Sequence, residues 1–304
     1  MKYFLKKTLI FLLLPLFSFM GLLLLFSISN SLVIFNEFKD NNIKYLIAGD
    51  SHIRQSFNDE KIKNAKNIAQ NSESYYFTYF KLKEIFKTNR HIKTVYLGLS
   101  YHNLSGYLDD FIFGKFSAPV SKNYFFIMPF SEKIRLIIAN KKEPLNFFKS
   151  IISANFKNLF TKEKSFMGGY NNVFSNSEAN KVSIEKRIAV QFFDKKKRVY
   201  DPAATNIRYL HEIIDLCRAN KVGLVLINPP VDKYYEHKIP KEYKHLIKEV
   251  VKRNELHYLD FHDLKLDESY FIPDGDHVSV KGAEICTQRL KQHLKNPDPD
   301  FNVN

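Results

Sequence analysis

A chain of 304 residues is long enough for one large domain with a substantial core, and nothing in its length requires a second domain. Its 46 lysine and arginine residues outnumber its 32 aspartate and glutamate residues, giving a formal net charge of +14. The lysines are spread along the chain, and the compact basic run Lys195–Arg198 is interpreted as a solvated loop. We therefore predict no nucleic-acid partner, and the charge favours an anionic lipid or glycan surface instead.

Residues 8–35 form an uncharged run rich in leucine and phenylalanine. The run exceeds the roughly 20 residues that cross a bilayer, and it also exceeds the apolar core of about 7–15 residues in a cleaved signal peptide. Ser27 and Ser29 imitate a cleavage site, but the apolar stretch before them is long. An uncleaved membrane anchor is the favoured interpretation.

Three lysines, Lys2, Lys6 and Lys7, precede this apolar run. Positive charges before a span keep that end in the cytoplasm. We therefore expect a single-pass protein of the cell membrane, with residues 1–36 as cytoplasmic stub and anchor. The domain that follows, residues 37–295, is expected outside the cytoplasm.

Beyond the anchor, short apolar runs alternate with helical patterns, which predicts an α/β domain with a parallel sheet and crossover helices. The expected strands are 44–48, 66–69, 94–100, 222–228 and 256–260. The expected helices are 75–88, 204–220, 241–254 and 279–295. The spacing of Ile207, Leu210, Ile213, Ile214 and Cys217 places one face of a helix against the sheet.

The segment from about 106 to 200 interrupts this alternation and is interpreted as an insertion in the domain. It is aromatic and basic, with expected helices at 131–140 and 145–160. Three roles remain open for it: a lid or acceptor-binding wall, a subdomain that pads the sheet, or a surface that rests on the membrane. Residues 296–304 have no core pattern and are expected to form a flexible tail.

A serine follows the first expected strand in Gly49-Asp-Ser-His52, and the late loop Pro273-Asp-Gly-Asp-His277 contains an acid and a base. A serine hydroxyl needs a base within hydrogen-bond reach and a third group that orients the base. Reactive groups of an open parallel sheet gather at the carboxyl ends of its strands. We therefore predict Ser51 as nucleophile, His277 as base and Asp274 as its orienting carboxylate. Asp276 is expected to point elsewhere, as a loop residue or a helix cap.

Gly49-Asp-Ser51 with Asp274 and His277 resembles the GDSL-like SGNH hydrolases and acyltransferases. The resemblance implies a flavodoxin-like, three-layer α/β/α domain over residues 43–295, with the Ser51 N–H as one oxyanion donor. An N-terminal anchor before Gly-Asp-Ser-His is similar to the membrane-attached members that act in envelope acylation, such as the D-alanine transfer protein and polysaccharide O-acetyltransferases. The implied partners are an envelope glycan or other acylated substrate and a multi-span membrane acyltransferase.

The family has two further characteristic sequence motifs, here called the second and third blocks, and both are less clear in this chain. The second block should bring a glycine whose N–H completes the oxyanion hole, but residues 67–74 contain none. Ser72 or Asn71 is the expected substitute. The third block should bring an asparagine beyond strand three, and Asn103, next to His102, is the candidate.

Asp50 and His52 admit a second interpretation, because Gly-Asp-x-His after a first strand also opens the metallophosphoesterases, where these residues bind metal. The later motifs of that class do not follow in order. We therefore expect no metal and no cofactor, and interpret Asp50 and His52 as pocket or helix-capping residues. Whether Cys217 and Cys286 form a disulfide stays open.

The hypothesis from the sequence is a membrane-anchored serine esterase or O-acyltransferase. It would act on acyl esters, most commonly acetyl, of envelope polysaccharide through an acyl-serine intermediate. Hydrolysis and transfer share every step up to that intermediate. The alternative hypothesis is a catalytically weak scaffold of the same fold that binds a glycan or a membrane acyltransferase.

Overall fold

The computed structural model describes residues 1–38, 42–160 and 166–295. The predicted flexible tail, 296–304, lies outside these ranges. The described residues contain a five-stranded sheet in the order β2-β1-β3-β4-β5, and every neighbouring pair is parallel. This order is that of flavodoxin-like doubly wound sheets, so the predicted fold class is confirmed. The strands are β1 Tyr45–Ala48, β2 Ala65–Asn67, β3 Thr94–Gly98, β4 Gly223–Asn228 and β5 His257–Asp260.

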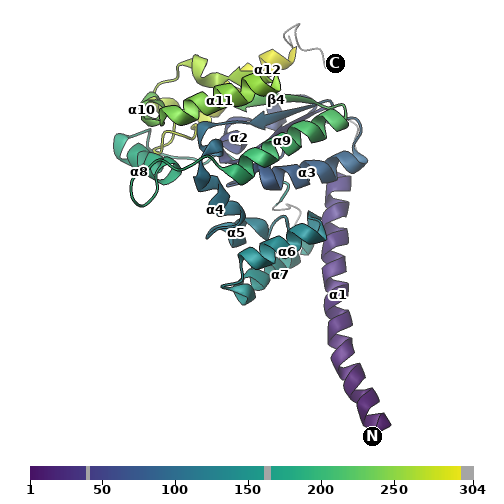
Figure 1. Ribbon diagram of the computed structural model, residues 1–304. Coiled ribbons are helices and arrows are strands. Elements are labelled where there is room, and N and C mark those ends of the chain that lie inside the picture. The colour runs from purple at the N-terminus through teal and green to yellow at the C-terminus, as the bar shows by residue number, and fades with distance from the viewer. Residues whose placement is uncertain (39–41, 161–165, 296–304) are drawn as a thin grey trace.

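Helices occupy most of the remaining chain (Figure 1). Those of the sheet domain are α2 Ser51–Ser56, α3 Tyr75–Thr88, α9 Ala204–Ala219, α10 Lys233–Lys238, α11 Lys241–Asn254 and α12 Val280–Lys295. The segment interpreted as an insertion carries α4 Asp109–Ile112, α5 Ser117–Ser121, α6 Phe130–Ala139, α7 Pro144–Phe160 and α8 Lys181–Phe192. The sequence pattern predicted α6 and α7 to within one residue but did not predict α8. Polar residues surround the two buried isoleucines of α8, Ile184 and Ile188, so its apolar stripe is weak.

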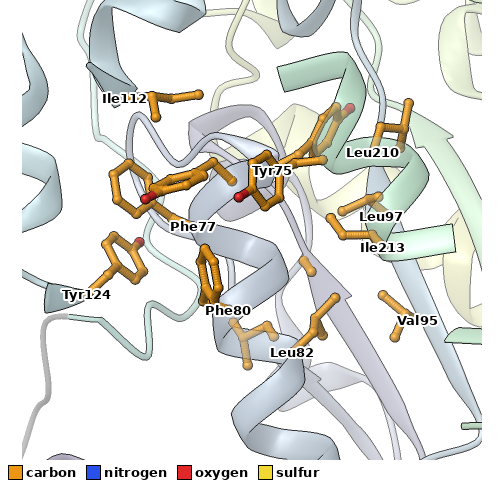
Figure 2. Close-up of a cluster of buried hydrophobic side chains, with 14 of the residues drawn as sticks. Tyr75, Phe77, Phe80, Leu82, Val95, Leu97, Ile112, Tyr124, Leu210 and Ile213 are labelled. Atoms are coloured by element: carbon orange, nitrogen blue, oxygen red, sulfur yellow. The ribbon is translucent and has the colours of Figure 1, made fainter. Parts of the chain in front are cut away.

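The sheet is covered on both faces. Alternate strand residues point to opposite sides, and they fall into two separate apolar clusters. Leu46, Val95 and Leu97 pack against α3, α9 and α11. Figure 2 shows part of this cluster, where Phe77 of α3 lies near Tyr124 of the insertion. On the other face, Ile47 and Tyr96 pack against α2 and α12.

The two cysteines lie on opposite faces of the sheet. Cys217 of α9 belongs to the first apolar cluster, and Cys286 of α12 belongs to the second. Both are free and buried. The sheet between them prevents a disulfide, which requires Cα atoms less than about 7 Å apart.

The N-terminal helix α1 spans Lys2–Phe38, and within the described residues it is the helix long and apolar enough to cross a membrane, over Lys6–Phe38. Its last part packs on the domain through residues spaced four apart: Phe26, Asn30, Ile34 and Phe38 are all buried. The rest of α1 projects away from the domain (Figure 1).

A buried ion pair joins the sheet domain to the inserted segment. The Lys81 ammonium donates to Glu73 at 2.6 Å and to the carbonyl oxygens of Ile68 (2.6 Å) and Phe166 (3.1 Å). Tyr124 Oη donates to Glu73 at 2.6 Å. Burial raises the pKa of Glu73 and lowers that of Lys81, and their mutual attraction opposes both shifts. The network fixes the start of α3, directly after the loop that contains Asn71 and Ser72.

The Lys81→Met substitution is expected to destabilise the protein strongly, because it leaves the Glu73 carboxylate buried without a cation. Losing one partner of a buried pair costs about 3–5 kcal/mol. Lys87→Met on the same helix is the matched control, since its pair with Glu84 is exposed and such pairs contribute about 0–1 kcal/mol. Urea unfolding of the full chain in detergent, followed by near-ultraviolet circular dichroism, measures both. Equal losses in the two variants would contradict a stabilising role for the buried pair.

Candidate active site

Ser51 begins helix α2 immediately after β1, at the carboxyl edge of the sheet. Asp50 caps the helix, because its Oδ1 accepts a hydrogen bond from the His52 N–H at 2.9 Å. The first N–H groups of a helix have no partner within the helix. The Ser51 N–H lies in this first turn of the helix, and its role as an oxyanion donor stays a prediction.

His277 lies between Ser51 and Asp274. Its Nε2 is 2.8 Å from Ser51 Oγ, and its Nδ1 is 2.8 Å from Asp274 Oδ2. The main-chain N–H of His277 also donates to Asp274 Oδ1 at 3.2 Å. The structure thus brings together the three predicted catalytic residues, with hydroxyl, imidazole and carboxylate in the order that nucleophilic catalysis requires.

The expectation for Asp276 is wrong, because its side chain is fully buried in the site. Its Oδ1 lies 3.0 Å from His277 Nδ1, although the hydrogen bond of that nitrogen goes to Asp274. Gly275, between the two aspartates, has φ +69°. This left-handed conformation, which glycine adopts readily, turns the chain so that both carboxylates face one imidazole. Ser279, not Asp276, stands at the start of α12, where its carbonyl accepts from Ala283.

Three further side chains hold the other oxygen of Asp276. Its Oδ2 accepts from Arg187 Nε at 2.7 Å and from Gln191 Nε2 at 2.8 Å, both on α8. His52 Nε2 lies 3.1 Å from the same oxygen. The inserted segment therefore supplies two of the groups that hold the carboxylate beside His277.

The two carboxylates have opposite pKa shifts. Burial raises the pKa of Asp276, but the charges of Arg187 and His277 outweigh it and hold that pKa well below its usual range. Burial and the charge of Asp276 raise the pKa of Asp274. Burial lowers the pKa of His277, yet the charge of Asp276 and the hydrogen bond to Asp274 raise it to about 10. Asp276 thus keeps its charge to lower pH than Asp274, and Asp274 takes the hydrogen bond.

His52 is buried between two other imidazoles. Its ring centroid lies 4.2 Å from that of His102 and 4.6 Å from that of His277. Burial and the charge of His102 lower the pKa of His52 to about 4, despite the opposing charge of Asp276. A neutral His52 that donates from Nε2 to Asp276 leaves Nδ1 as an acceptor, and this atom has no hydrogen-bond partner within the described ranges.

A cavity of about 240 Å³ opens at Ser51. The predicted residue Asp50 and the loop residues Asn71 and Ser72 line it together with Ser51. The other lining residues are Gln55, His102, Tyr107, Leu108, Phe111, Arg187 and His277.

The predicted oxyanion residues differ in their placement. Ser72 lines the cavity and has φ +58°, a conformation that favours glycine. The backbone at Ser72 therefore suits the glycine that the resemblance implies at this block. Asn103 is buried beneath Asp50: its Nδ2 donates to Asp50 Oδ2 at 2.8 Å, and its Oδ1 accepts from the Ser100 N–H at 2.7 Å. Both oxyanion assignments stay predictions.

His52, Asp276 and His277 offer ligand atoms within 4.8 Å of one another, which is a spacing that could hold a metal ion. In the structure these side chains belong to a hydrogen-bond network. His277 is hydrogen-bonded to Ser51 and Asp274 through its two nitrogens, while His52 Nε2 lies against Asp276. Asp50, the other ligand in the metallophosphoesterase interpretation, is bound to His102 at 2.6 Å.

Sequence reasoning did not identify Asp276, Arg187, Gln191 or His102 as residues of this site. Arg187 and Gln191 lie on the helix that was not predicted, 89 and 85 residues before their aspartate. The glycine in Asp-Gly-Asp is the feature of the sequence that indicates a turn here, and such a turn can bring both carboxylates to the same imidazole.

A protein-family model that carries no descriptive name matches residues 141–297, a range that includes Asp274 and His277 but not Ser51. No curated protein matches the chain significantly. Among solved structures, the chain is similar to a GDSL-like lipase from Bacteroides thetaiotaomicron, with 10% sequence identity over 84% of this chain and 89% of that chain and a TM-score of 0.39. It is also similar to a proposed platelet activating factor from Streptococcus pneumoniae, with 12% identity over 92% of this chain and 98% of that chain and a TM-score of 0.44.

Asp276→Asn is expected to move the pH dependence of Ser51 reactivity to lower pH. The base must be neutral to accept the serine proton, and the Asp276 charge keeps the imidazole protonated up to a pKa of about 10. Removing that charge lowers the pKa, so the rate rises at lower pH. The measurement is the rate of labelling by a fluorophosphonate probe as a function of pH.

Two further variants make this measurement specific. Asp274→Ala removes the hydrogen bond to Nδ1 and is expected to lower the maximal rate by about 10²–10⁴, the usual contribution of an oriented base. Asp267→Asn is the matched control, since this exposed carboxylate accepts hydrogen bonds from Ser269 in its own turn. An unchanged pH midpoint in a folded Asp276→Asn protein would refute the role assigned to its charge.

Ser72→Gly and Ser72→Ala are both expected to label like the wild type, because the predicted oxyanion donor at this position is the main-chain N–H. The glycine variant is also expected to be more stable by about 1 kcal/mol, since it removes the cost of φ +58° for a residue with a Cβ. Labelling rates and thermal unfolding measure the two effects. A roughly hundredfold loss of labelling in Ser72→Ala would show that the hydroxyl is the donor instead.

Proposed function

We propose that this chain, a member of the family matched over residues 141–297, is a serine esterase or O-acyltransferase of the SGNH type. Ser51 attacks the acyl carbonyl, His277 accepts its proton, and Asp274 orients the imidazole while the Asp276 charge stabilises the imidazolium. The observation that carries the proposal is the continuous chain of short contacts from Ser51 Oγ through His277 to Asp274, with 2.8 Å at each step.

The reaction has two halves. In the first, an ester bond of the donor breaks, an ester to Ser51 forms, and the imidazolium returns its proton to the leaving alkoxide. In the second, His277 removes a proton from water or from a sugar hydroxyl, whose oxygen attacks the acyl-serine; the ester bond to Ser51 breaks, and the imidazolium returns the proton to Ser51 Oγ. The two acceptors distinguish an esterase from a transferase.

The proposed substrate is an acyl ester, most commonly acetyl, on a polysaccharide of the cell envelope. A domain outside the cytoplasm, held at the membrane by α1, would meet such glycans and could receive acyl groups from a multi-span membrane acyltransferase. The support for this placement is the apolar length of α1 together with the three lysines before it, which favour a cytoplasmic N-terminus.

A second candidate function is a weakly catalytic scaffold that binds a glycan or a membrane acyltransferase. One observation favours it: the Asn103 amide, a predicted oxyanion donor, is hydrogen-bonded to Asp50. Loss of one oxyanion donor costs about 10²–10³ in rate, so a protein with an incomplete hole would react slowly.

Labelling with a fluorophosphonate probe decides between the two candidates. We expect the full-length protein in detergent to label, and Ser51→Ala not to label. Thr287→Ser, a conservative change of a buried hydroxyl on α12, controls for nonspecific loss and should label normally. Absence of label in a folded wild-type protein would favour the scaffold.

Acetate release from an acetylated polysaccharide separates hydrolysis from transfer. We expect Ser51-dependent release, and an acceptor glycan should divert acetyl groups from water to sugar if the protein is a transferase. Addition of a chelator should leave both reactions unchanged, whereas a loss on chelation would support the metal interpretation.

A further inference from the structure

Helices α6 and α7 carry an apolar face in addition to the one that packs on the domain. On α6, Phe130, Ile134 and Ile138 are spaced four residues apart and are exposed by 77%, 38% and 58%. On α7, Leu145 and Phe156 are exposed by 83% and 53%. A helix is normally polar on the face that is turned away from its core, so these side chains need a second apolar environment.

The packed face of the pair is distinct and complete. Leu136 of α6 and Phe147 and Ile151 of α7 are buried in the main apolar cluster. The exposed residues are therefore not an unformed part of the core. Contiguous exposed apolar surface on a folded protein marks a contact with a membrane or with another protein.

The packed side of the helix pair and the segment just before it contact α1, which places the pair beside this helix. Asn30 of α1 donates to Asn155 Oδ1 of α7 at 2.9 Å, and the ring of Phe26 lies 5.3 Å from that of Phe126. In Figure 1 one end of the α6–α7 pair lies at the part of α1 nearest the domain, and the pair extends away from α1 below the sheet domain. The two helices therefore lie at the level where the chain would leave a bilayer.

The apolar segment of α1 is long enough to bring α6 and α7 close to the bilayer surface. Its apolar segment Lys6–Phe38 has 33 residues, which at 1.5 Å per residue span about 50 Å, more than the roughly 30 Å hydrocarbon core. Ile28, Leu32 and Phe35 are exposed in the same part of α1 that packs on the domain. The exposed apolar surface of α1 thus continues to the height of α6 and α7.

Positive charges accompany the apolar face. Lys141 and Lys142 are exposed in the turn between the two helices, and Lys149 is exposed on α7. Lysines beside a membrane are attracted to anionic headgroups. An apolar face bordered by lysines is the pattern of a helix that lies in a membrane interface.

We propose that α6 and α7 form a second membrane contact. Their exposed apolar side chains enter the interface of a bilayer that contains anionic lipid, and Lys141 and Lys142 bind its headgroups. The helix pair and α1 then hold the domain at two points, which fixes its orientation above the membrane.

Fluorescence quenching in vesicles of phosphatidylcholine and phosphatidylglycerol tests the proposal on the full chain. Leu145→Cys carries an environment-sensitive dye, with Leu14→Cys in α1 as the lipid reference and Val280→Cys on α12 as the water reference. The native Cys217 and Cys286 are buried, and burial raises the pKa of both thiols, so they react poorly with the dye. We expect quenchers on the lipid chains to act several-fold more strongly at Leu145 than at Val280, and iodide to show the reverse.

Each contrary result overturns the proposal. Equal behaviour at positions 145 and 280 would place the helix pair in water. Protection of position 145 from both quenchers would mean that protein, not lipid, covers it. Absence of lipid quenching at position 14 would remove the anchor on which the second contact depends.

The lysine component has its own test. Replacing Lys141 and Lys142 by glutamine should reduce lipid quenching at position 145 in vesicles with phosphatidylglycerol and leave it unchanged in pure phosphatidylcholine. The glutamine variant keeps the length and exposure of the side chains, so the charge is the variable. An identical response in both lipids would refute recognition of anionic headgroups.

Discussion

Removing an ionised carboxylate from water costs several kcal/mol unless charges and hydrogen bonds replace the solvent. Asp276 is such a group, and Arg187, Gln191 and His52 replace its water. These partners come from the helix α8 and from α2, whereas Asp276 belongs to the loop before α12. The requirement to neutralise one buried charge therefore joins three distant parts of the chain around His277.

The same charge separates two tasks that a single aspartate usually combines. Asp274 accepts the Nδ1 hydrogen bond and sets the ring orientation, while Asp276 supplies the field that favours the imidazolium. A strong field has an opposing consequence, since it also keeps the resting imidazole protonated. Arg187 moderates the field because its own charge lies against Asp276. The protonation state of His277, on which the proposed reactivity of Ser51 depends, is thus set by a balance between the charges of Asp276 and Arg187.

Much of the fold follows from local pattern. The five predicted strands each overlap an observed one, and α3 and α11 begin and end at the predicted residues. The link from Ser51 to His277 was also predictable, because the carboxyl ends of parallel strands meet at one edge.

The surroundings of His277 were not predictable in the same way. Arg187 contacts Asp276 across 89 residues, and no periodicity within α8 encodes that contact. The position of Asp276 depends on the left-handed Gly275, whose conformation is a property of the folded loop. Asn103 was found from its place after β3, yet its amide is directed by Asp50, a partner that only the tertiary structure reveals.

The two cysteines, one beneath each face of the sheet, have a consequence for where the chain can fold. Neither oxidation nor reduction of a cross-link accompanies formation of this core, and the sheet keeps the thiols from meeting. The core is held together by apolar burial, hydrogen bonds and internal ion pairs. The domain can therefore reach the same native state in a reducing or an oxidising compartment, without the help of a disulfide-forming catalyst.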